Sequence, residues 1–329
     1  MRAIFTFSVL TLVFCVGCPP TATEPEKDKP ADSVETSDFD NPAPLVEPMY
    51  PKQREEDTPD EAPADESAVP ETTGVTALTH GKYAGEVVPL PPLEDLTAQI
   101  DEYMTSIASS LEYLDGSTKY ERDAADIVRD ANALALVAFA LGLAEGDSKY
   151  KPSASPIIAA AKTLAAAQNL DEGNKAYDAL KASLIGRGNG KSLSWTEKVA
   201  DLAPVMKALP NLSSAVKRVT DTERKIGLLS ESKAKQVYGQ LATMAVIAQG
   251  SIPNVMETTK PNATAEWKKY CEEFRDAAIK ANAAARQYAQ DKADGKEPNY
   301  ATFSTSFKSM TESCDDCHKE FFPKAIGQK

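Results

Sequence analysis

Residues 300–321 read YATFSTSFKSMTESCDDCHKEF, and the spacing of their side chains decides the fold that we expect. Apolar residues and two cysteines return at steps of three and four, which is the period of one face of an α-helix. The members of this stripe are Tyr300, Phe303, Phe307, Met310, Cys314, Cys317 and Phe321. We therefore predict a helix whose cysteine-bearing face lies against the interior of a helical bundle.

The same stretch contains the run Cys314-Asp315-Asp316-Cys317-His318, a C-x-x-C-H motif. This spacing is the attachment signature of a c-type haem: two thiols add to the vinyl groups of one porphyrin, and the next imidazole ligates the iron. The chain has only five Cys and two His, so the motif is unlike a chance match. It predicts one covalently bound haem c, attached at Cys314 and Cys317, with His318 as an axial ligand of the iron.

Two other uses of these residues stay open at this point. Two thiolates and an imidazole supply three of the four ligands of a structural zinc site, but no second Cys/His pair completes it. The other histidine, His80, lies in a Pro-rich polar stretch, and Cys271 lies alone on an apolar helical face, where it should pack as a small hydrophobe. A disulfide between Cys314 and Cys317 is the second alternative for an exported protein.

The amino terminus indicates export. An apolar run after Arg2 has the charge and length of a signal-peptide core and is short for a membrane span. It ends in Cys15-Val16-Gly17-Cys18, which resembles a bacterial lipoprotein processing site, although Cys15 stands where Leu is usual. We expect residues 1–18 to direct export and Cys18 to carry the lipid that anchors a periplasmic protein to a membrane; simple secretion and an uncleaved anchor are the alternatives.

Residues 19–92 carry most of the acidity of the chain. They contain 17 Asp and Glu, 5 Lys and Arg, and 14 of the 22 Pro. Such a segment buries too little apolar surface to offset the entropy of ordering it, so we expect a disordered acidic linker. The rest of the chain is nearly neutral and has no cluster of basic residues, so no nucleic-acid partner is expected.

From Leu93 onward, apolar residues recur at helical spacing, and no stretch shows the sustained alternation of a strand. The pattern predicts four helices in residues 93–190, which end in a glycine-rich break, and four more in residues 191–329. Ser194 and Glu197 have capping-box spacing at the start of the second set. We therefore predict an all-α fold of two antiparallel four-helix bundles in tandem, of which the first has no Cys or His and so no haem.

Two prolines, Pro204 and Pro210, lie in the first expected helix of the second bundle. Proline removes a helical hydrogen bond and clashes with the preceding turn. We expect this helix to be kinked or interrupted.

A C-terminal C-x-x-C-H on the fourth helix of a bundle resembles the cytochrome c′ family, and the resemblance covers residues 193–323. It implies that Cys314 and Cys317 form the thioethers and that His318 is the proximal ligand. A basic residue commonly stands four positions after that histidine in the family, whereas Phe322 stands there in this chain. Members of the family often dimerise through helix faces, so the resemblance implies a homodimer, with coverage of that face by the first bundle as the alternative.

The resemblance leaves the sixth ligand of the iron open. Members similar to low-spin cytochromes use a Met from the first helix of the bundle, whereas five-coordinate members leave the iron open to small gases. Met206 stands at the matching place, and its alternative role is core filling. Met244 and then Met256 are the next candidates.

Signatures of conventional enzymes are missing from the sequence. It has no phosphate-cradling glycine loop after a strand and no G-x-S-x-G elbow, and a catalytic relay would have to use the expected haem ligand. We expect a membrane-tethered periplasmic cytochrome that passes single electrons to redox partner proteins and is not an enzyme. A five-coordinate module that binds or senses NO or CO is the alternative, and a scaffold lipoprotein without haem is a weaker one.

Overall fold

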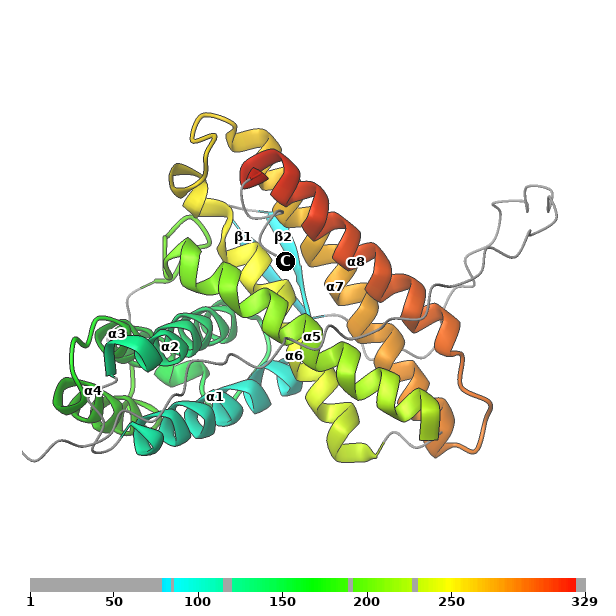
Figure 1. Ribbon diagram of the computed structural model, residues 1–329, viewed down its shortest axis with the longest axis horizontal. Helices are drawn as coiled ribbons and strands as arrows, with labels where there is room; N and C mark the ends of the chain where they lie inside the picture. Colours follow the sequence, from blue (N-terminus) through cyan, green and yellow to red (C-terminus); the bar gives the residue numbers. More distant parts are fainter. Residues whose placement is uncertain (1–78, 84–85, 115–119, 189–191, 227–229, 324–329) are drawn as a thin grey trace, which may run out of the picture. The chain divides into compact units, whose positions relative to one another are not determined.

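The computed structural model describes residues 79–83, 86–114, 120–188, 192–226 and 230–323 (Figure 1). The expected signal peptide with Cys18 and most of the expected linker lie outside these residues. The fold is all-α apart from one short hairpin. This confirms the predicted fold class.

A β-hairpin corrects the end of the predicted disordered linker, residues 19–92. Strand β1 (Thr79–Tyr83) pairs antiparallel with β2 (Glu86–Leu90), and His80 lies opposite Pro89. Val88 and Leu90 point into the core and are buried. Their two-residue period is the strand signal, but it is too short to stand out from the polar stretch before it.

The first four helices pack in chain order, each against the next. Their bounds confirm the predicted helices: α1 (Leu93–Tyr113), α2 (Tyr120–Leu143), α3 (Ala154–Ala165) and α4 (Leu170–Ser183), with the 3-10 turn η1 (Lys151–Ser153) before α3. Helix α2 is buried on all sides from residue 130 to residue 141. A helix that is apolar all round belongs to the centre of a structure.

The second set contains four helices and a second 3-10 turn. They are α5 (Leu202–Ile226), α6 (Glu231–Gly250), η2 (Ile252–Glu257), α7 (Thr264–Ala293) and α8 (Tyr300–Phe321). Helices α7 and α8 lie side by side (Figure 1). Helix α6 is buried on all sides from residue 239 to residue 250, as α2 is.

The start of α5 corrects the prediction from the capping box. The chain turns at Ser194–Glu197 without forming a helix, and α5 begins at Leu202. Pro210 lies inside α5, which continues through it, so of the expected kink or interruption the interruption does not occur. Pro204 lies in the first turn, where the missing N–H has no intrahelical partner to lose.

The structure does not confirm two bundles in tandem. Helices α1 and α2 pack directly on α6, α2 also packs on α5, and the buried side chains form one continuous core from Val88 to Phe321. A polar contact crosses the same boundary: Asn282 and Arg286 of α7 donate to the buried carboxylate of Asp95 on α1. The two sets of four helices therefore stabilise each other.

No helix in the described ranges is both long and apolar enough to cross a lipid bilayer.

Candidate functional site

Helix α8 turns its predicted stripe toward the core. Phe303, Met310 and Phe321 are buried, whereas Cys314 and Cys317 are partly buried and pack against the core. This confirms that the cysteine-bearing face lies inward. The side chains of both cysteines therefore contact the core and remain partly exposed.

The three motif residues line one small cavity together with Met206 of α5. The cavity has a volume of about 30 Å³, is partly open, and is lined by side chains from α5, α6, α7 and α8. Its lining residues are Met206, Leu209, Ala248, Ser251, Trp267, Tyr270, Cys271, Phe274, Cys314, Cys317 and His318. The structure therefore brings the sequence-predicted Met206 to the C-x-x-C-H motif, although more than a hundred residues separate them along the chain.

Helix α7 supplies one wall of the cavity. Trp267 is buried, and its indole N–H donates to the Ser251 carbonyl over 2.9 Å. Its ring meets Phe321 of α8 edge-on, with the ring centroids 5.1 Å apart. Trp267 therefore fixes the end of α6 against α8 and closes the cavity on that side.

Two of the cavity thiols, Cys317 and Cys271, have a raised pKa in the folded chain. Burial raises the pKa of Cys317 to about 12, and Cys314 beside it contributes in the same direction. Burial also raises the pKa of Cys271 well above its usual value, with a smaller contribution from Cys317. Cys271 packs as the predicted buried hydrophobe, and it also faces the cavity.

The surroundings of His318 differ from the pattern of the resembled family. The ring of Phe322 stands edge-on to the His318 ring, with the centroids 6.0 Å apart. Lys319, which could supply a charge near this histidine, forms an ion pair of 2.6 Å with Asp316. An aromatic contact thus occupies the place of the basic residue beside His318.

The other candidate methionines do not line the cavity. Met244 is buried within α6 and does not line the cavity, and Met256 in η2 is 72% exposed. Met310 packs in the core one turn before the motif. Met206 is left as the thioether that faces the motif.

The side chains that line the cavity include the groups that a c-type haem requires, but the volume of the cavity is small. Two thiols, an imidazole and a thioether face each other across apolar walls, which is the set that a c-type haem uses. A volume of about 30 Å³ is close to the share of one water molecule in the liquid, so the side chains that line the cavity would have to move to admit a porphyrin. The backbone of α5 packs mainly on α6 and α2 and less on α7 and α8.

The two alternatives for the motif find less support. In the described ranges, no three His, Cys, Asp or Glu side chains gather closely enough to hold a metal ion, so the zinc reading lacks a ligand set. Cys271, Cys314 and Cys317 form no disulfide in the described part of the chain.

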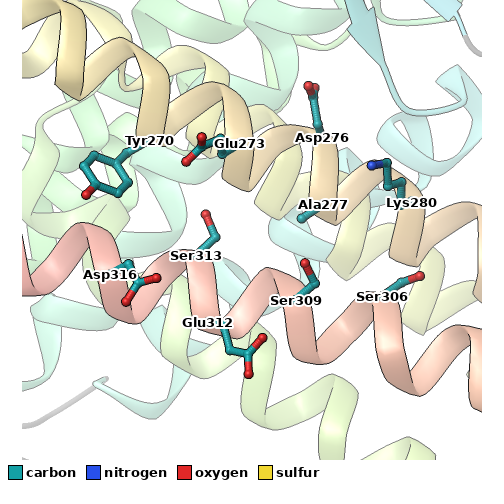
Figure 2. A pocket seen from close by; sticks show the side chains of 10 residues that line it. All are labelled: Tyr270, Glu273, Asp276, Ala277, Lys280, Ser306, Ser309, Glu312, Ser313 and Asp316. Carbon is teal, nitrogen blue, oxygen red and sulfur yellow. The ribbon is translucent and has the colours of Figure 1, made fainter. Parts of the chain in front are cut away.

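A second hollow lies between α7 and α8. It has a volume of about 470 Å³, and Figure 2 shows its lining side chains on α7 and α8. Four of them are carboxylates, and each forms an ion pair with a basic residue of its own helix. The hollow is therefore close to neutral, and its charge indicates no particular ligand.

Sequence reasoning missed several residues of the cavity wall. Leu209 and Ala248 read as ordinary core positions, because nothing local separates a residue that faces a cavity from one that faces another helix. Cys271 and Phe274 stood on the recognised apolar stripe of α7. Only the packing of α7 on α8 shows that this stripe faces the motif.

Comparisons with known proteins add no relative. No family model, no curated protein and no solved structure matches the chain. The assignment of a function therefore rests on the residues and the geometry of this site.

Proposed function

We propose that the protein is a periplasmic c-type cytochrome that is tethered to a membrane and transfers single electrons through one haem c. The observation that carries the proposal is the cavity in which Met206 faces Cys314, Cys317 and His318. In this proposal α5–α8 form a cytochrome c′-like unit, and α1–α4 support it as a set of helices without haem.

Each residue of the cavity has a distinct role in this proposal. Cys314 and Cys317 would hold the porphyrin by thioether bonds, and His318 and Met206 would ligate the iron. A haem held there supplies a one-electron couple between ferric and ferrous iron. The apolar wall excludes water from the iron, and a Met/His ligand pair raises its reduction potential.

The proposal also covers what lies outside the described residues. Residues 1–18 would direct export, Cys18 would carry the lipid anchor, and the acidic stretch after it would hold the folded part away from the membrane. Redox partner proteins would then exchange electrons with the haem in the periplasm.

The absorption spectrum of the purified holoprotein tests the proposal. We expect a low-spin spectrum with the signature of Met ligation, together with a mass increase equal to one haem. Met206→Ala should convert this spectrum to high-spin, whereas the matched variant Met244→Ala should leave the ligation unchanged. A protein that is purified without any haem band, from cells able to attach haem c, would overturn the proposal.

The second candidate is a five-coordinate haem module that binds NO or CO. It is favoured by the α5 side of the cavity, where Leu209 stands beside Met206 and offers the iron no ligand. A high-spin spectrum in the wild type that shifts with CO or NO would support it. The scaffold lipoprotein without haem is the third candidate, and a disulfide between Cys314 and Cys317 in the purified protein would support that one.

A further inference from the structure

We propose that residues 254–259, between α6 and α7, form a clamp that sets the spacing between the helix carrying Met206 and the helix carrying His318, with Glu257 as its positioning residue. The inference rests on the proposed function, because these two helices would supply the axial ligands. The evidence for the clamp itself is a set of hydrogen bonds that join one short segment to both helices.

Glu257 caps the start of α5 from a distant segment of the chain. The N–H of Leu202, the first residue of α5, donates to the Glu257 carboxylate over 2.9 Å. Asn254 donates its side-chain amide to the same carboxylate over 2.7 Å and to the Ala200 carbonyl over 2.9 Å. The first N–H groups of a helix lack partners within it, and a cap usually comes from the adjoining residue. In this chain the cap comes from η2, so α5 cannot shift without losing it.

Thr259 holds the end of α8 from the same segment. Its hydroxyl donates to the carbonyl of Phe321, the last residue of α8, over 2.7 Å, and its own N–H reaches that oxygen over 3.4 Å. The last carbonyls of a helix also lack partners within it. Residues 254–259 therefore satisfy the first N–H of α5 and the last carbonyl of α8.

The positions of the ligand residues make this clamp relevant to the cavity. Met206 lies one turn after Leu202, and His318 lies in the last turn of α8. Both side chains line the cavity, and α5 has little other contact with α8. The clamp is thus the tie that fixes how far the Met206 side stands from the His318 side.

The charges around Glu257 favour its ionised form. Burial alone would raise the pKa of Glu257, but the ion pair of 2.8 Å with Lys198 and the bonds from Leu202 and Asn254 lower it below its usual value. Asp201 shares the Lys198 ammonium over 2.8 Å. The clamp is therefore complete above the ordinary carboxyl pKa and weakens as the pH falls through the lowered one.

The rate at which Cys271 reacts with iodoacetamide reports whether the clamp holds α5 in place, with or without a bound haem. This buried thiol lines the cavity and is not part of the attachment motif, so iodoacetamide reaches it when α5 moves away. We expect Glu257→Ala to increase the labelling rate about fivefold, the usual effect of a lost helix cap. In the holoprotein, the same variant should raise the high-spin fraction of the spectrum.

Matched variants separate the clamp from general destabilisation. Thr259→Val removes the bond to α8 and should also speed labelling of Cys271. Lys198→Met removes an exposed ion pair but keeps the cap, so its labelling rate should stay within about twofold of the wild-type rate.

If Glu257→Ala does not fold by circular dichroism, Glu257→Gln, which keeps an acceptor for Leu202, should label at nearly the wild-type rate. Wild-type rates in both Glu257→Ala and Thr259→Val would overturn the clamp. A wild-type protein without haem would refute the proposed function and leave the labelling test intact.

Discussion

The two sets of four helices share one core but differ in the kinds of side chain that line their interiors. The α1–α4 set has no cysteine or histidine, and its interior is filled mainly by aliphatic side chains, together with Phe139, Tyr103 and Met104. The α5–α8 set has a cavity lined by three thiols, an imidazole and a thioether. In the described helices, the cysteines and the histidine therefore gather in the second set.

The largest effect is expected from the removal of the attachment thiols. Cys314→Ala with Cys317→Ala should abolish covalent haem, because no other described cysteine has the motif spacing. Mass spectrometry of the intact protein and the absorption spectrum check this. Cys271→Ala is the control and should keep the haem, since this thiol only lines the cavity. Retention of covalent haem by the double variant would contradict the contrast between the two sets.

Trp195 tests whether the two sets unfold together. This residue stands before α5, is fully buried, and meets Phe139 of α2 edge-on with the centroids 5.0 Å apart. Trp195→Ala should lower the free energy of unfolding by about 3–5 kcal/mol, which is typical of a large aromatic removed from a core. Calorimetry should show one transition in the wild type and in the variant.

The matched variant for this position is Trp195→Phe. It keeps a ring against Phe139 and removes an indole N–H that is buried without a hydrogen-bond partner. Its loss of stability should be much smaller than that of Trp195→Ala. Two separate transitions in the wild type would show that the sets are independent domains after all.

The polar contact between α1 and α7 tests the same boundary with a smaller change. Asp95 is buried, and Asn282 and Arg286 donate to it over 2.9 Å and 3.0 Å. Asp95→Ala leaves both donors without this acceptor and should reduce the free energy of unfolding by about 3 kcal/mol. Glu94→Ala removes an exposed carboxylate that bonds the same Arg286, and should change stability by less than about 1 kcal/mol. Equal effects of the two variants in denaturant titrations would refute the structural role of Asp95.

The smallest effect is expected in the stability of the protein at alkaline pH. There the thiol of Cys317 titrates in the haem-free protein, whereas a thioether at this position does not. The folded chain raises the pKa of Cys317 from 9.0 to about 12, so the neutral thiol is favoured. The folded haem-free protein therefore keeps this contribution below pH 9 and loses it as the pH rises toward 12. In the haem-bound protein the thioether does not titrate, so this part of the alkaline loss should be missing. Thermal melts of the haem-free and haem-bound proteins from pH 8 to pH 11 would show the difference, and identical curves would contradict it.

Local signals in the sequence were sufficient for most of the helices. The stripe from Tyr300 to Phe321 and the apolar run after Leu93 carry their period within a few residues, and the structure has helices there. The start of α5 was missed because its cap, Glu257, lies 55 positions further along the chain. The hairpin at residues 79–90 was missed because the polar, Pro-rich composition of this stretch predicts disorder. The strand pattern of its two buried side chains is too short to be recognised.

The sequence by itself determined the attachment motif, the inward face of α8 and the all-α class, because spacing along one helix is a local property of the chain. Only the tertiary structure decided that Met206 meets the motif, that Cys271 joins them, and that α1 and α2 complete the core of the second set. These are contacts between segments far apart in sequence, and they depend on which apolar faces bury the most surface against each other. No pattern within one helix specifies that choice.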